Sequence, residues 1–186
     1  MIYNVRMEQD FARILIPRKR IEQRVAELGR EITQSYGEDS REVVLVAILA
    51  GSIIFLADLV RYLPFKMKLG LITVSRYRGA TTTGGETLFK SSLDVDLTGR
   101  HVLLIDDILD SGGTIRAVSD ELMTHHPASL KSCVLLRKPS KAPKDLQPDF
   151  LGFDIEDVFV VGYGLDYNSQ YRNWPDIGEL RPELYS

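Results

Sequence analysis

Three aspartates and a run of small residues lie close together between Asp106 and Thr114, in the segment DDILDSGGT. Glycines allow several backbone N–H groups to converge on an anion, and a helix that begins at such a loop adds partial positive charge, so the small residues favour a phosphate ligand. Carboxylates beside that phosphate would repel it unless hydroxyl groups or a cation lay between them. The segment therefore indicates a ligand that carries a phosphate, hydroxyl groups and Mg²⁺.

Two predicted elements position this segment. The apolar run VLLI at residues 102–105 contains two β-branched members and is typical of a strand buried on both faces. Apolar residues recur at helical spacing after Thr114, which predicts a helix over 114–125. The expected order is therefore a buried strand, an acidic edge, a loop of small residues and the start of a helix.

A second strand, loop and helix come earlier in the chain. The run VVLVAIL at 43–49 predicts another buried strand, and a helix is expected over 53–62, with Ala50, Gly51 and Ser52 between them. These three residues form either an ordinary strand-to-helix connection or a second anion pocket lined by backbone amides, and spacing alone favours neither. The loop is not a Walker A motif, because no Gly-Lys-Ser/Thr follows it.

The remaining pattern completes an α/β chain. We predict a helix over 17–36 that ends at Gly37, strands over 66–74, 131–136 and 158–161, a return strand over 88–97, an exposed loop over 78–86 and an irregular tail over 168–186 that folds back on the body. Strands that alternate with helices predict a mainly parallel sheet. Ligands of such sheets bind beyond the carboxyl ends of the strands, where we expect residues 50–52, residues 106–114, Lys138 and Asp166.

Composition excludes several classes of protein. The 186 residues are expected to form one domain, and a formal net charge of −3 lacks the basic excess typical of nucleic-acid-binding proteins. Cys133, the only cysteine, can form no internal disulfide and lies in an apolar run, so we expect it in the core. The chain has neither a signal-like N-terminus nor a long apolar run, so we expect no nucleic-acid partner, no membrane span and a cytoplasmic location.

Two segments resemble a known family. The stretch VLLIDDILDSGGT at 102–114 resembles the 5-phosphoribosyl-1-pyrophosphate (PRPP) motif of type I phosphoribosyltransferases. The stretch FVVGYGLDYN at 159–168, followed by Tyr171 and Arg172, is similar to the C-terminal segment of hypoxanthine(-guanine) phosphoribosyltransferases. The resemblance implies that residues 1–186 form one phosphoribosyltransferase domain. Its fold would be a mainly parallel central sheet flanked by helices, with a small hood formed by N- and C-terminal segments.

The resemblance implies purine salvage: a 6-oxopurine base would displace pyrophosphate from PRPP in the presence of Mg²⁺ and give IMP or GMP. Asp106 and Asp107 would hold the ribose hydroxyls, directly or through Mg²⁺, and Asp110 would be the acid/base at the purine N7 atom. The remaining PRPP contacts would come from backbone amides, hydroxyl groups and one cation. These residues are Ser111, Gly112, Gly113 and Thr114 for the 5′-phosphate, and Ala50, Gly51, Ser52 and Arg172 for pyrophosphate, with a Leu49–Ala50 peptide that is cis in the family.

By the same resemblance, other residues would bind the base. Lys138 would donate to the purine O6 atom, the Phe159 ring would stack on the base, and the Val160 backbone would contact its edge. Asp166 would reach the base region and a second Mg²⁺. Residues 75–90 would form a lid over the site, with Ser75, Arg76 and Tyr77 at its base.

The sequence departs from the family pattern at several positions, among them Asp106, where many relatives have a glutamate. Arg76 stands where the family has the serine of a Ser-Tyr pair, and Ala50 stands where a lysine or arginine is common. We hypothesise that lid arginines replace part of the charge missing at Ala50. Two alternatives stay open: a phosphoribosyltransferase for another base such as xanthine, and a PRPP-binding regulator of the same fold that binds nucleic acid. Such folds commonly pair, so we expect a homodimer or homotetramer.

Overall fold

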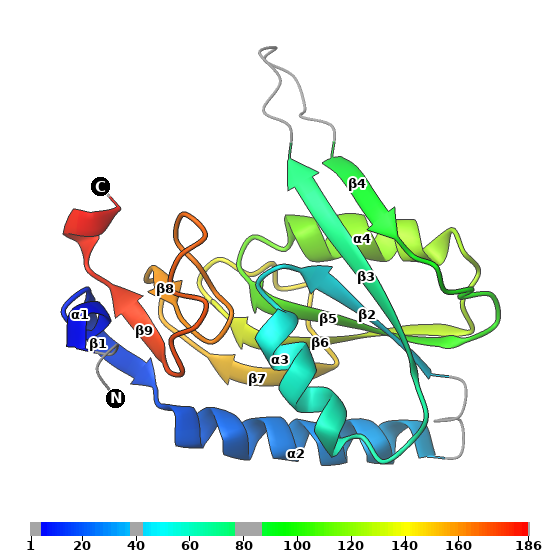
Figure 1. Ribbon diagram of the computed structural model, residues 1–186. Coiled ribbons are helices and arrows are strands. Elements are labelled where there is room, and N and C mark those ends of the chain that lie inside the picture. Colours follow the sequence, from blue (N-terminus) through cyan, green and yellow to red (C-terminus); the bar gives the residue numbers. More distant parts are fainter. Residues whose placement is uncertain (1–4, 38–42, 77–86, 186) are drawn as a thin grey trace, which may run out of the picture.

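The computed structural model describes residues 5–37, 43–76 and 87–185, and it contains a large sheet and a small one (Figure 1). The large sheet has six strands in the order β4-β3-β2-β5-β6-β7. β3, β2, β5, β6 and β7 are parallel to their neighbours, whereas β4 lies antiparallel at the edge. The strands are β2 (Val43–Leu49), β3 (Lys68–Arg76), β4 (Thr87–Ser92), β5 (His101–Leu109), β6 (Ser129–Arg137) and β7 (Phe150–Asp154).

Helices cover both faces of the large sheet, with α2 (Arg18–Tyr36) and α3 (Ile53–Leu59) on one face and α4 (Gly113–Met123) on the other (Figure 1). A 3₁₀ turn, η2 (Val60–Tyr62), follows α3. Alternate residues of the central strands face opposite layers: Leu45 packs in the core beneath α2 and α3, and Val46 packs in the core beneath α4. The predicted class, a mainly parallel sheet flanked by helices, is confirmed.

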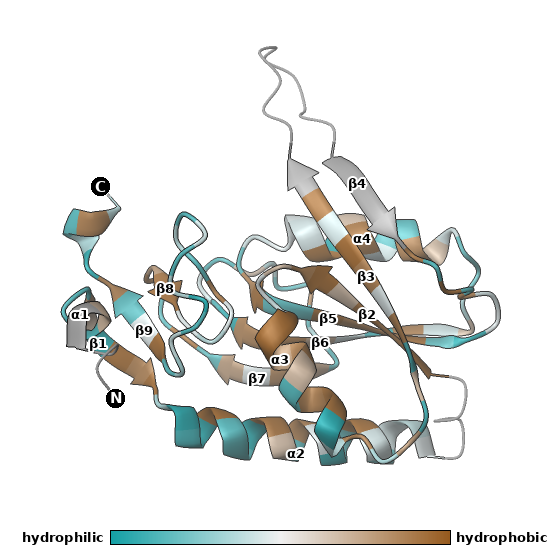
Figure 2. Cartoon of the chain, viewed as in Figure 1, coloured by the Kyte–Doolittle hydropathy of each residue, from teal (hydrophilic) through white to brown (hydrophobic). Residues whose placement is uncertain are grey.

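The helix predicted over 17–36 is also confirmed. α2 begins after Pro17 and ends before Gly37. Its apolar stripe, Ile21, Val25 and Leu28, is fully buried against the sheet, while its outer face is hydrophilic (Figure 2). Cys133 is buried in the same core, as expected. No helix in the described part of the chain is long and apolar enough to cross a membrane.

The small sheet forms the predicted hood from both ends of the chain. It has the strand order β1-β9-β8, where β1 is Phe11–Ile16, β8 is Val160–Val161 and β9 is Ile177–Leu180. Phe11, Val161, Trp174 and Leu180 form its own buried cluster. Short helices, α1 (Val5–Glu8) and η3 (Pro182–Leu184), flank it. The hood stands beside the carboxyl edge of the large sheet (Figure 1).

The structure corrects the predicted end of the central strand. β5 continues to Leu109 and therefore includes Asp106 and Asp107, which we expected beyond its end. The reason is that β5 pairs with β2 only as far as Ile105, whereas its pairing with β6 continues to Leu109. The acids thus lie on an extended strand that has lost one of its two neighbours, and this opens the sheet beside them.

Other corrections concern short or distant strands. β7 was not predicted, since its five residues include a central glycine that weakens the strand pattern. The tail expected to be irregular contains β9, which pairs with β1 and β8 across most of the chain. The predicted 158–161 strand is only the two residues of β8, in the hood. The expected loop over 78–86 lies outside the described residues.

Candidate functional site

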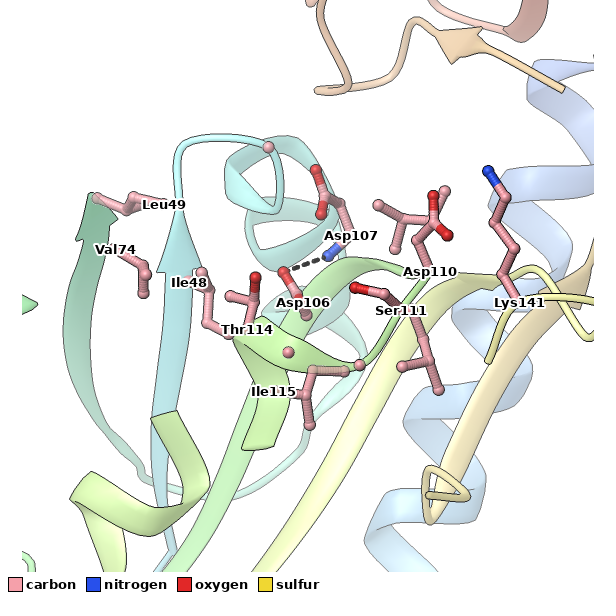
Figure 3. A pocket seen from close by; sticks show the side chains of 15 residues that line it. Ile48, Leu49, Val74, Asp106, Asp107, Asp110, Ser111, Thr114, Ile115 and Lys141 are labelled. Carbon is pink, nitrogen blue, oxygen red and sulfur yellow. Dashed lines mark hydrogen bonds between the residues drawn. The ribbon is translucent and has the colours of Figure 1, made fainter. Parts of the chain in front are cut away.

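A cavity of 740 Å³ lies at the carboxyl edge of the large sheet, where β2, β3 and β5 end and α4 begins (Figure 3). We call it the first cavity. Its lining includes the whole predicted segment from Asp106 to Thr114, together with Gly51 and Lys141. Ligands of open parallel sheets bind at this edge. The structure therefore brings the acids and the small residues of the sequence motif into one concave site.

The small residues form the turn that starts α4. Gly112 precedes the helix with φ of 77°, a backbone conformation that glycine adopts at little cost. A Cβ atom there would lie 2.6 Å from Cδ2 of Leu146, so a larger residue would have to displace that side chain as well as adopt the positive φ. Ser111, Gly113 and Thr114 line the first cavity beside it. Because the first backbone N–H groups of a helix have no partner within the helix, this turn suits an anion.

The two adjacent acids on β5 are unusually placed. Asp106 is buried, with 5% of its surface exposed, and its Oδ1 atom accepts a hydrogen bond of 3.0 Å from the backbone N–H of Asp107. Burial is the main reason why the pKa values of both carboxyls are raised, and the neighbouring Asp107 charge adds to the effect on Asp106. A cation beside the pair would remove this cost of ionisation.

The donor set fits Mg²⁺ bound together with a ligand. In the described part of the chain, no cluster of three or more His, Cys, Asp or Glu side chains could hold a metal ion. Two carboxylates, Asp106 and Asp107, are adjacent on β5. Mg²⁺ is commonly held by one or two carboxylates, with the rest of its coordination supplied by water and substrate phosphates. The pair therefore fits a metal that arrives with its substrate.

The earlier loop of small residues meets these acids. A Cβ atom on Gly51 would lie 1.6 Å from the Asp107 Oδ2 atom, so the loop backbone and this carboxylate are in close contact. The Leu49–Ala50 peptide is cis, as the resemblance implied. The Ser52 hydroxyl does not face the cavity, because it is fully buried and donates to the Ile48 carbonyl oxygen. Ala50 is exposed and is absent from the lining of the first cavity.

A second cavity, of 260 Å³, adjoins the first. The two share Asp107, Ile108 and Asp110. The rest of its lining is the set that the resemblance assigned to the base, completed by one apolar residue: Lys138, Phe159, Val160, Leu165 and Asp166. Residues that lie far apart in the sequence are thus brought together by the end of β6 and by the hood.

Lys138 is the main cation of the second cavity. Its side chain is only 8% exposed, and its Nζ atom lies 3.1 Å from Oδ1 of Asp157 and 3.5 Å from Oδ2 of Asp110. Lys141 reaches the same Asp157 oxygen at 2.9 Å. Asp157 and Lys141 were not predicted as site residues. The available signal was that they lie near Phe159 and Lys138 in the sequence. The ion pairs of Asp157 with Lys138 and Lys141, however, join residues that are far apart in the sequence.

Arg172, like Ala50 and Ser52, is a predicted residue that lines neither cavity. Its guanidinium donates to the Gly164 carbonyl oxygen at 2.6 Å and pairs with Asp166 at 2.8 Å. Gly164 has φ of 103°, and a Cβ atom there would lie 2.2 Å from the Gly51 carbonyl oxygen. Arg172 therefore braces the point where the hood touches the loop at Gly51, and its charge moderates the raised pKa of Asp107.

The predicted lid is described only at its base. Ser75 and Arg76 end β3, directly after Val74, which lines the first cavity. Tyr77 lies outside the described residues, as does the stretch that follows it up to residue 86. The assignment of residues 75–90 as a lid, and the role suggested for Arg76, stay predictions.

Comparison with known proteins agrees with this geometry. The model of the phosphoribosyl transferase domain family matches residues 16–168. The chain is 41% identical over 167 residues to the hypoxanthine phosphoribosyltransferase of Salmonella typhimurium, covering 90% of this chain and 94% of that one. It is 39% identical over 180 residues to the hypoxanthine-guanine phosphoribosyltransferase of Mycobacterium avium, covering 95% and 89%.

The fold agrees as closely. A crystal structure of a hypoxanthine phosphoribosyltransferase from Staphylococcus aureus matches with a TM-score of 0.91 at 36% identity, covering 99% of each chain. Sequence and structure thus agree over nearly the whole length, and the range that the family model matches, 16–168, includes every residue that lines the two cavities. The chain belongs to the phosphoribosyl transferase domain family.

Proposed function

We propose that this chain is a purine salvage enzyme that transfers the 5-phosphoribosyl group from PRPP to hypoxanthine or guanine, giving IMP or GMP and pyrophosphate. One observation carries the proposal: a cavity lined by an anion loop and paired acids meets a second cavity lined by an aromatic ring and a buried lysine. The relatives reported above are named for this activity. None of them is named as a nucleic-acid-binding regulator, and the formal net charge of −3 lacks the basic excess that such binding favours.

In the first cavity, PRPP would be held by its charged ends and its ribose. Ser111, Gly112, Gly113 and Thr114 would bind the 5′-phosphate at the start of α4. The backbone of Ala50 and Gly51 would bind pyrophosphate, while Ser52 supports that loop through its bond to Ile48. Arg172 would assist pyrophosphate binding in one of two ways. It would hold the loop at Gly51 through its contact with Gly164, or it would release Asp166 and contact pyrophosphate when PRPP binds.

Asp106 and Asp107 would hold Mg²⁺ and the ribose hydroxyls, and Asp166 would approach a second ion. Bound with PRPP, Mg²⁺ would stabilise the negative charge that develops on the leaving pyrophosphate. The acids also suit the ribose, because its C1 centre gains positive charge as the bond to pyrophosphate breaks, as in glycoside cleavage. Carboxylates near that centre favour its formation.

In the second cavity, a purine would lie against the Phe159 ring, with its edge on the backbone of Val160. Lys138 would donate a hydrogen bond to the O6 atom, which hypoxanthine and guanine have and adenine lacks. Asp110 lines both cavities, so it can reach the purine N7 atom beside the ribose. There the Asp110 carboxylate would accept the N7 proton as the bond between the purine and the ribose forms.

We also propose that the whole chain acts as one domain and pairs as a homodimer or homotetramer. Apolar side chains are exposed on one flank: Ile53 and Ile54 of α3, and Leu69 and Leu71 of β3. Exposed apolar patches are typical of protein interfaces. Light scattering after size-exclusion chromatography measures the oligomer directly, and a monomer at micromolar concentration would contradict this part of the proposal.

One assay tests the activity. The purified chain is incubated with PRPP and Mg²⁺ and, separately, with hypoxanthine, guanine, xanthine, adenine and uracil, and both nucleotide and pyrophosphate are measured. We expect both products with hypoxanthine or guanine and little with adenine or uracil. Xanthine as the best substrate would move the assignment to another base. Absence of product with every purine would overturn it.

A further inference from the structure

A chain of alternating charges lies behind the second cavity. Lys141 contacts Asp157, Asp157 contacts Lys138, and Lys138 contacts Asp110. The two lysines are brought together by a turn in which the backbone N–H of Lys141 donates to the Lys138 carbonyl oxygen at 3.0 Å. Only Asp110 and Lys138 have been given roles in the reaction above. Asp157 is the unassigned member that connects to Lys138 from behind.

Lys138 has two carboxylate partners, which it contacts unequally. An ammonium group carries three N–H donors. The contact with Asp157 is a hydrogen bond of 3.1 Å, whereas the Asp110 oxygen lies at 3.5 Å, beyond the usual range for such a bond. Asp157 is therefore the principal partner of Lys138. This arrangement leaves a donor for a ligand in the second cavity and keeps Asp110 largely free.

The position of Asp157 suits this role. It stands two residues before Phe159, so the segment that carries the stacking ring also carries the carboxylate that holds the lysine. The same Asp157 oxygen accepts from Lys141 at 2.9 Å, and these two lysines lower the pKa of the Asp157 carboxyl. Asp157 thus stays ionised, and Lys141 holds the same Oδ1 atom that Lys138 contacts.

We propose that Asp157 is a positioning residue that fixes the Lys138 ammonium for the purine O6 atom and keeps it from closing onto Asp110. This rests on the proposed function. Without Asp157, the nearest remaining carboxylate for Lys138 is Asp110. The lysine would then form an ion pair with Asp110. Lys138 could no longer donate to the 6-oxo group, and Asp110 could no longer act as the acid/base. Asp157 is in this way a determinant of 6-oxopurine specificity that does not itself touch the base.

The test is a double-mutant cycle with Asp157→Asn and Lys138→Met, read by steady-state kinetics. Hydrogen bonds between ionised groups are roughly twice as strong as those between neutral groups. We therefore expect Asp157→Asn to raise KM for hypoxanthine and lower kcat, so that kcat/KM falls about tenfold or more, while KM for PRPP changes by less than about twofold. Preference for hypoxanthine over adenine should fall in parallel. In the Lys138→Met background, Asp157→Asn should have no further effect.

Two variants control the cycle. Asp154→Asn removes a carboxylate of β7 that is also partly exposed, pairs with Arg137 and lines neither cavity, and it should leave both KM values unchanged. Asp157→Glu keeps the charge and should restore most of the hypoxanthine activity. Because the Asp157 carboxylate is partly exposed, and such pairs contribute little to stability, thermal unfolding of Asp157→Asn should match that of the wild type.

The outcomes separate the two proposals. Wild-type protein that makes no nucleotide from any purine overturns the proposed function. Active wild-type protein with unchanged kinetics in Asp157→Asn overturns the positioning role alone. Equal losses from Asp157→Asn in the presence and absence of Lys138 also overturn it, because Asp157 would then act by another route.

Discussion

The two cavities treat their aspartates in opposite ways. In the first cavity, burial raises the pKa values of Asp106 and Asp107. Behind the second cavity, two lysines lower the pKa of Asp157, the carboxylate that holds Lys138. The first cavity therefore holds acidic charge that waits for a cation, whereas the second neutralises its own. This difference matches the two substrates, because PRPP can bring Mg²⁺ with it and a purine base is uncharged.

The cavities also differ in how the chain builds them. Most of the first comes from one continuous segment, 106–115, at the junction of β5 and α4. The second is assembled from the ends of β5 and β6 and from the hood, which itself needs strands from both chain termini. One cavity is thus a local motif, and the other exists only after the whole chain has folded. Asp110 belongs to both.

The largest effect on turnover is expected at Asp110, which lines both cavities. Asp110→Asn keeps the shape of the side chain and removes its ability to exchange a proton. General acid–base catalysis contributes about 10²–10⁴-fold, so kcat for hypoxanthine should fall by that factor. The dissociation constant for PRPP with Mg²⁺, measured by calorimetry, should stay within about threefold of the wild-type value, since the PRPP ligands are untouched.

A matched control for this variant is Asp120→Asn, which changes an exposed aspartate on α4 that lines neither cavity. It should leave turnover and PRPP affinity unchanged. If Asp110→Asn instead weakened PRPP binding and left turnover intact, Asp110 would belong to the first cavity alone, and the acid/base role would have to be given to another residue.

A second prediction tests the uncompensated acid of the first cavity through stability. The pKa of Asp106 is raised in the folded protein above its ordinary value of 3.8. The folded state therefore binds the proton more tightly than the unfolded state, and the free energy of unfolding falls as pH rises from about 4 toward neutrality. Each unit by which the pKa is raised costs about 1.4 kcal/mol at neutral pH. Asp106→Asn should remove this cost and stabilise the protein.

Urea unfolding of the wild type and Asp106→Asn between pH 4 and pH 7.5, without Mg²⁺ or PRPP, measures this. The gain should be measurable at pH 7.5 and should shrink toward pH 4, while PRPP affinity is lost. Asp157→Asn is the contrasting variant and should show no gain at any pH. Equal curves for Asp106→Asn and wild type would mean that the carboxylate is stabilised within the protein.

The sequence could predict the first cavity because its chemistry is local. The types and order of residues 106–114 alone predict an anion loop and an acid pair. The structure has the expected strand and helix on either side of the loop. Even here one feature was inaccessible: Asp106 lies inside β5, because the strand loses its β2 partner after Ile105. Which neighbour a strand loses is a property of the sheet and leaves no trace in the strand itself.

The second cavity could be named by resemblance but not built from the sequence. Lys138 and Phe159 carry no signal that they face each other, since a lone lysine and a strand phenylalanine are common. Asp157 was missed because its meaning depends on Lys138, and β9 was missed because its partners are at the other end of the chain. Long-range pairing decides these contacts, whereas sequence patterns record local ones.

The smallest expected effect lies at the far side of the second cavity. The Phe159 ring stacks on Tyr185, with centroids 4.7 Å apart and planes at 24°. Tyr185 does not line the cavity, whereas Phe159 does, so the tail supports the ring from behind. Aromatic pairs contribute about 0.5–1.5 kcal/mol beyond their buried area. Tyr185→Leu should therefore raise KM for hypoxanthine and for guanine by about two- to tenfold.

Tyr185→Leu should affect the second cavity and leave the first cavity unchanged. KM for PRPP should not change in Tyr185→Leu, because neither Tyr185 nor Phe159 lines the first cavity. Tyr185→Phe keeps the stacked ring and should keep both KM values, which separates ring support from any role of the hydroxyl. An equal rise in KM for both substrates would show that the tail holds the hood as a whole against the sheet. The two cavities would then depend on the same distant contacts, and only the anion loop would remain a local motif.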